Sequence, residues 1–161
     1  MEFNEDPIEE KEIRDEDYVD IYSKRAIFGF SVFSNVFGGI LLVINLWVAG
    51  YKRAVSEVLL FLLSFNIASY YLSLLIIKYA NIKVDPDIIK KASSGTPLTF
   101  NELLPLIQLT GISLAFNIIA AFIYTRYFFK KYFPDDDYYP KSILRPLIIY
   151  IIIALFSRSI F

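Results

Sequence analysis

Few side chains in this sequence could carry chemistry, and those that could are mostly neutral. The chain has neither cysteine nor histidine, which excludes thiolate nucleophiles, Cys-based metal sites and the commonest general base. Ser113 lies in an apolar Gly-Ile-Ser-Leu segment, but a serine nucleophile needs a neighbouring base, normally the histidine that this chain lacks. The consecutive carboxylates Asp135 to Asp137 would splay apart in a turn, so we expect no metal site there. The sequence predicts a protein that is not an enzyme and has no cofactor.

The neutral polar and small residues within apolar segments are better candidates for helix packing. Ser34 and Gly38 form a small-xxx-small pair, which lets two helix backbones approach closely, and Gly39 follows directly. Polar residues three and four apart share one helix face, and this spacing occurs twice more. The predicted packing residues are Ser34, Gly38, Gly39, Asn66, Ser69, Ser73, Thr110, Ser113 and Asn117.

Two polar faces in this set, Asn66 with Ser69 and Ser73, and Thr110 with Ser113 and Asn117, are predicted to lie at matching depths in the membrane. If their helices cross a membrane antiparallel, a rise of ~1.5 Å per residue brings Asn66 and Asn117 to about the same level. The serines and the threonine beyond them coincide in the same way. We therefore expect the two faces to meet and the two amides to bond, directly or through one water. Such a bond would fix register more than it stabilises the fold.

Four apolar segments must position these side chains. The first three contain no charged residue, and a helix of ~20 residues crosses a hydrocarbon core of ~30 Å. The fourth carries Arg145 and Arg158 near its ends, where long basic side chains can reach the interface. The predicted spans are 26–49, 58–77, 103–125 and 142–161. We expect an all-α integral membrane protein with four transmembrane helices in an antiparallel bundle.

Composition and charge fit this class of protein. Apolar residues make up 56 % of the 161-residue chain, and the charged residues avoid the apolar segments. A net charge of −1 gives no indication of nucleic-acid binding. Residues 1–25 are rich in acidic side chains, and we expect a disordered tail.

Local signals define the connections between the segments. The basic turn after Gly50 ends the first helix, and Asp85-Pro86 can start a short helix. Thr99 with Glu102 forms a capping box, so the third helix should begin at about Phe100. That helix should continue through the basic, aromatic segment after residue 125 until Pro134 stops it.

One segment resembles a known group of proteins. Residues 37–42 (FGGILL), followed by Asn45-Leu46 and the basic turn after Gly50, are similar to the first helix of small bacterial multi-pass membrane proteins of unknown function. The resemblance implies a bacterial inner membrane and brings no activity with it.

The basic residues do not orient the predicted bundle. Equal numbers of them lie on the two sides, so the positive-inside rule gives no preference, although four crossings would put both termini on one side. Arg126, Lys130 and Lys131, which lie among aromatic residues, have two interpretations. We expect an ordinary interfacial anchor, and the alternative is a site for anionic lipid headgroups.

Function follows only in outline. The leading hypothesis is a non-catalytic accessory or interaction subunit of a membrane complex, with the lipid bilayer and another membrane protein, or a second copy, as partners. The alternative is a small transporter or channel subunit that acts as an oligomer. A polar cavity would favour transport, and a dry, packed bundle would favour an accessory role.

Overall fold

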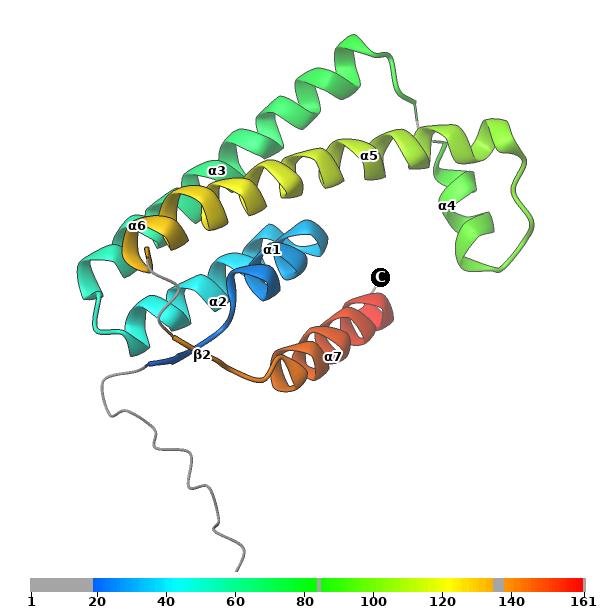
Figure 1. The fold of residues 1–161 in the computed structure, drawn as a ribbon. Helices are drawn as coiled ribbons and strands as arrows, with labels where there is room; N and C mark the ends of the chain where they lie inside the picture. The colour runs from blue at the N-terminus through cyan, green and yellow to red at the C-terminus, as the bar shows by residue number, and fades with distance from the viewer. Residues whose placement is uncertain (1–18, 84, 135–137, 161) are drawn as a thin grey trace, which may run out of the picture.

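The computed structural model describes residues 19–83, 85–134 and 138–160, and this part of the chain is mostly helical (Figure 1). The prediction of an all-α fold is confirmed. The elements in chain order are β1 (Asp20–Ile21), α1 (Lys24–Phe33), α2 (Asn35–Val48), α3 (Lys52–Tyr79), α4 (Pro86–Ser93), α5 (Phe100–Phe122), η1 (Ile123–Phe129), α6 (Lys130–Tyr132), β2 (Tyr139–Pro140) and α7 (Leu144–Ile160).

The expected single helix over 26–49 is not formed. Its place is taken by α1 and α2, which meet at Ser34. The Ser34 backbone is extended, its N–H donates to the Phe30 carbonyl at 2.9 Å, and its hydroxyl accepts from the Phe37 N–H at 3.3 Å. One residue therefore ends α1 and caps the start of α2. The two helices fold back on each other as a hairpin (Figure 1).

The hairpin is too short to cross a membrane with either helix. With 10 and 14 residues, α1 and α2 are about 15 and 21 Å long at ~1.5 Å per residue. Gly50, at φ +80°, ends α2, and the Tyr51 N–H donates to the Leu46 carbonyl at 2.8 Å. This is the helix end expected at the basic turn. Both ends of the segment therefore lie at the same end of the molecule.

Among the described residues, two helices are long and apolar enough to cross a membrane. One is α3, with 28 residues, and the other is the 33-residue stretch Phe100–Tyr132, in which α5, η1 and α6 are continuous. The predicted start at Phe100 and the continuation to the residues just before Pro134 are confirmed. Within it, η1 is a π-helix, and the Thr125 hydroxyl donates to the Ala121 carbonyl at 2.7 Å.

The hydrophobic core lies at one end of these two helices. The buried residues of α3 are Ala54, Val55 and Val58, all near its start. Those of α5 are Ala120 and Ala121, near its end. The hairpin packs against this end, whereas α3 and α5 separate from each other toward the end that carries α4 (Figure 1). We call the packed part, which contains the start of α3 and the end of α5, the hairpin end.

A short parallel strand pair joins the segments that precede α1 and α7. Asp20 pairs with Tyr139 and Ile21 with Pro140, so both helices start from one place. The fourth predicted span forms α7, whose 17 residues extend about 26 Å at ~1.5 Å each. The Tyr150 ring packs against Phe37, with ring centroids 5.3 Å apart.

The predicted tail 1–25 differs from the structure at its end. Most of that range, residues 1–18, lies outside the described residues, as do Asp135 to Asp137. Residues 20–25 are not a tail, because they form β1 and the start of α1. Ile21 is 1 % exposed and packs in the core. An apolar Ile-Tyr pair after the acidic run therefore belongs to the folded domain.

Candidate functional site

An asparagine closes the base of the hairpin. The Asn45 side chain accepts a hydrogen bond from the Tyr22 N–H at 2.8 Å and donates one to the Tyr22 carbonyl at 2.7 Å. Both residues are buried. Tyr22 precedes α1 and Asn45 lies in the last turn of α2, so this pair of bonds joins the two ends of the hairpin. It satisfies two backbone groups that burial would otherwise leave unpaired.

A second asparagine holds the tip of the hairpin. The Asn117 side chain donates to the carbonyls of Val32 and Phe33, both at 3.3 Å. These are the last carbonyls of α1, which have no partner within their own helix. In an apolar environment such groups are costly to leave unsatisfied, so Asn117 makes the broken helix tolerable.

The expected meeting of Asn66 with Asn117 does not occur. The Asn66 amide donates to the Leu62 carbonyl of its own helix, at 2.7 Å, while Asn117 turns toward α1. Asn66, Ser69 and Ser73 are half-buried along α3. The polar face of α5 lines a separate open groove of about 550 Å³ beside the hairpin tip, made by Val32, Phe33, Leu109, Thr110, Ser113, Leu114 and Asn117.

The two glycines of α2 lie where helices approach most closely. A Cβ atom added to Gly38 would lie 2.7 Å from the Cα of Ser31, so it would meet the backbone of α1. One added to Gly39 would lie 2.9 Å from the Tyr124 hydroxyl and 3.1 Å from a methyl carbon of Leu62. Gly38 therefore sets the spacing inside the hairpin, and Gly39 sets its spacing to the two long helices.

The three basic residues expected at the interface have separate environments. Lys131 pairs with Glu57 at 3.2 Å, and the Tyr132 hydroxyl donates to the same carboxylate at 2.9 Å. This cluster ties α6 to the first turns of α3. Lys130 is exposed. Arg126 instead lines an open cavity of about 430 Å³ together with Lys24, Arg25, Phe28, Phe122 and Thr125. Sequence reasoning missed Lys24 and Arg25 because it assigned them to the opposite side of the membrane.

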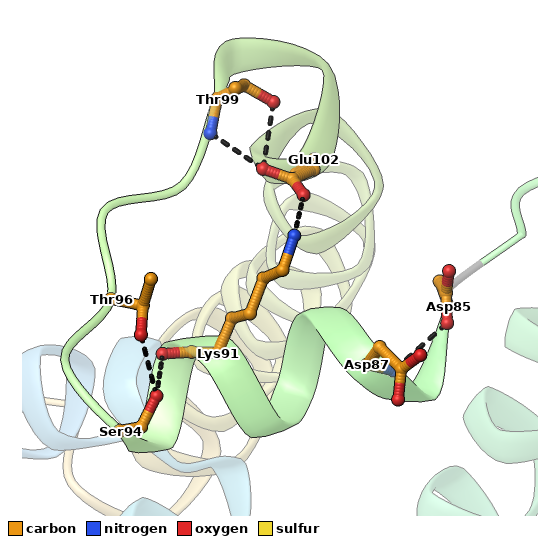
Figure 2. Close-up of polar contacts among 7 residues, drawn as sticks. All are labelled: Asp85, Asp87, Lys91, Ser94, Thr96, Thr99 and Glu102. Atoms are coloured by element: carbon orange, nitrogen blue, oxygen red, sulfur yellow. Dashed lines mark hydrogen bonds and ion pairs between the residues drawn. The ribbon is translucent and has the colours of Figure 1, made fainter.

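A polar corner connects α4 to the start of α5 (Figure 2). The Glu102 carboxylate accepts hydrogen bonds from the Thr99 N–H at 2.8 Å and from the Thr99 hydroxyl at 2.9 Å. Lys91 of α4 donates to its other oxygen at 2.7 Å. The sequence signal found the Thr99 and Glu102 pair, but not Lys91, because that contact depends on where α4 docks.

We predict that this corner weakens in acid, as the pH falls below about 4.5. The lysine bond, followed by the two threonine bonds, lowers the pKa of Glu102, which precedes the uncharged stretch of α5, to about 2 from an ordinary 4.5. Because the folded-state pKa is depressed, the stabilisation is fully present above pH 4.5 and is lost as the pH falls toward 2. Protection of the α4 amides from hydrogen exchange, relative to their intrinsic rates, should therefore be highest above about pH 4.5 in wild type and should fall as the pH decreases toward 2. Glu102→Gln should lower this protection at neutral pH, and unchanged exchange would contradict the contact.

No family model, curated protein or solved structure matches the chain. The distinctive parts of the structure are a clamped helical hairpin, two helices long and apolar enough to cross a membrane, and a cavity lined by three basic residues.

Proposed function

We propose that this chain is a non-catalytic integral membrane protein, an accessory or interaction subunit of a membrane complex. One observation carries the proposal: the two long apolar helices are not covered by the chain itself. Leu63 and Ile67 on α3 are 62 % and 51 % exposed, and Ile107 on α5 is 55 % exposed. Helices of this length and composition would be buried in a soluble protein, so these need lipid or another helix around them.

The proposed arrangement in the membrane has two full crossings in place of four, one within α3 and one over the uncharged stretch 103–125 of Phe100–Tyr132. The hairpin enters from one side and returns to it, with its tip about 15 Å deep, near the middle of a ~30 Å core. The Asn117 and Asn45 bonds support such a re-entrant segment, because they satisfy backbone groups where no water is at hand. The resemblance of residues 37–42 and the residues that follow to small bacterial membrane proteins supports a bacterial inner membrane.

The hairpin also removes the tie in the positive-inside count. It brings Lys24 and Arg25 to the side that already carries Lys52 and Arg53. The basic residues of the hairpin end then outnumber those near α4, which are Lys78, Lys83, Lys90 and Lys91. The positive-inside rule therefore favours a cytoplasmic hairpin end with a cytoplasmic N-terminus, and α4 outside.

Cysteine labelling in intact cells tests this orientation. A cysteine at position 94, in the loop after α4, should react with an impermeant reagent, and one at position 4 should react only after lysis. Labelling of position 4 in intact cells would contradict the orientation. Position 160 reports α7: the expected placement of both termini on one side holds only if α7 does not cross.

The accessory role is tested by purification in a mild detergent. A stoichiometric membrane partner, or a homo-oligomer, should co-purify and should crosslink through photoreactive groups at Ile67 and Ile107. The matched control is a photoreactive group at Trp47, which is 64 % exposed but lies on the hairpin. A monomer that crosslinks only to lipid from both Ile67 and Ile107 would contradict the interaction role.

The second candidate is a small transporter or channel subunit that acts as an oligomer. The groove beside the hairpin tip favours it, because broken helices that meet polar side chains at the membrane centre bind ions and substrates in transporters. Flux of small ions through liposomes containing the protein, reduced by Asn117→Leu and unaffected by Asn66→Leu, would replace the accessory role with transport.

A further inference from the structure

Three cations converge on one open cavity at the hairpin end. Lys24 and Arg25 begin α1, Arg126 lies on η1, and all three line the cavity of about 430 Å³. Within the part of the chain that the structure describes, no carboxylate pairs with any of them. Thr125 and two aromatic side chains complete the lining, so no acidic residue is among the groups that form it.

The position of these cations along the chain fixes their depth. Arg126 is the first charged residue after the uncharged stretch 103–125, and Lys24-Arg25 are the last charged residues before the uncharged stretch 26–51. In the proposed membrane arrangement all three therefore lie at the level of the lipid headgroups. The start of α1 adds the positive end of a helix dipole.

The cavity has a charged rim and an aromatic wall. The rings of Phe28 and Phe122 meet edge to face, with centroids 5.3 Å apart, and join α1 to α5. Phe122 is 47 % exposed. An inorganic anion would use the cations alone, whereas a lipid has acyl chains that such a wall can cover. The combination indicates an amphipathic anion.

We propose that this cavity binds the phosphate group of an anionic phospholipid, with the acyl chains lying along Phe28 and Phe122. The proposal rests on the membrane insertion proposed above. The proposed site shares Arg126 with the lipid site considered from the sequence, but it contains Lys24 and Arg25 in place of Lys130 and Lys131. Lys131 is occupied by Glu57, and Lys24 and Arg25 supply the charge instead. Arg126 and Arg25 can each hold a phosphate through two parallel bonds.

Lipid binding to the protein in a neutral detergent tests the proposal. Titration with phosphatidylglycerol and phosphatidylcholine, followed by native mass spectrometry at about 150 mM salt, should show a preference of tenfold or more for the anionic lipid. The variant Lys24→Gln, Arg25→Gln, Arg126→Gln should bind phosphatidylglycerol on the order of a hundredfold more weakly, from roughly 1 kcal/mol per basic residue.

The matched control is Lys52→Gln, Arg53→Gln, Lys130→Gln, which removes the same charge from the same end of the molecule. It should keep phosphatidylglycerol binding within about threefold, because salt screens charges outside the contact. Equal losses in both triple variants would overturn the site in favour of diffuse charge. Equal binding of the two lipids would also overturn it. Displacement of the lipid by millimolar inorganic phosphate would assign the cavity to a free anion and overturn the lipid.

A single-residue variant and a test of membrane insertion separate loss of the lipid site from loss of folding or of insertion. If the triple variant does not fold, Arg25→Gln alone should weaken binding about fivefold, since Arg25 is exposed at the rim. Resistance to carbonate extraction reports insertion separately. Retained insertion without lipid preference would overturn only the cavity, whereas extraction from the membrane would overturn the proposed function.

Discussion

Gly38→Ala should destabilise the protein more than alanine at any other helical glycine. The added methyl carbon would lie 2.7 Å from both the Cα and the Cβ of Ser31, on the facing helix of the hairpin. Ser31 is fully buried, and its hydroxyl donates to the Ile27 carbonyl at 2.7 Å, so it has nowhere to go. The helices must separate, at a cost of ~1–3 kcal/mol or more.

Other glycines of the same helices serve as controls. Gly29 has nothing within 4 Å of an added Cβ, so Gly29→Ala should be neutral or stabilise by up to ~1 kcal/mol through helix propensity. Gly39→Ala should fall between the two, because its neighbours are side chains. Thermal unfolding in mild detergent, followed by the fluorescence of the single tryptophan, Trp47, measures all three. Equal melting temperatures for Gly38→Ala and Gly29→Ala would contradict the close approach.

Asn45→Leu should have the second large effect. It removes two buried hydrogen bonds and leaves the N–H and the carbonyl of Tyr22 without partners in a closed site. An unsatisfied buried group costs ~1–3 kcal/mol, so we expect a loss of about 3 kcal/mol in the free energy of unfolding. Leucine has a similar volume, so the loss reports the hydrogen bonds more than the packing.

Asn66→Leu is the matched control for this substitution. The Asn66 amide bonds only to its own helix and is half-buried, so its replacement should change stability by less than ~1 kcal/mol. The same unfolding experiment compares the two variants, and hydrogen exchange at the start of α1 should rise only for Asn45→Leu. Similar losses in both would show that the hairpin base does not depend on the amide.

Sequence reasoning succeeded where a feature depended on neighbouring residues. The helix start at Phe100 follows from Thr99 and Glu102, three residues apart, and α4 follows from Asp85-Pro86. It failed at 26–49, because the re-entrant hairpin proposed here and a full crossing both need an uncharged apolar run. The one signal for the break was Ser34 as a helix cap, and the same residue also fits a packing pair with Gly38.

The pairing of Asn66 with Asn117 failed for a different reason. Depth along a helix follows from the rise per residue, and Asn117 does lie near the level of the hairpin tip. Rotation about the helix axis does not follow from depth. The hairpin occupies the side of α5 where α3 was expected, and a prediction of one continuous helix over 26–49 leaves no hairpin to place there. The basic cavity was missed through the same error, because it needs Lys24 beside Arg126.

The hairpin has a consequence for how the protein is made. In the proposed membrane arrangement, its first apolar segment leaves the ribosome long enough to be threaded across a bilayer. The Tyr22 and Asn45 bonds form within the hairpin itself, but the other segments that hold it are synthesised much later. Asn117 follows Val32 by 85 residues, and the strand that pairs with β1 comes later still. Until then the tip lacks its bonds from Asn117, and the base lacks its pairing with β2. If the hairpin is re-entrant as proposed, the membrane topology is therefore settled late in synthesis, by a segment that must be retained at, or returned to, the side from which it entered.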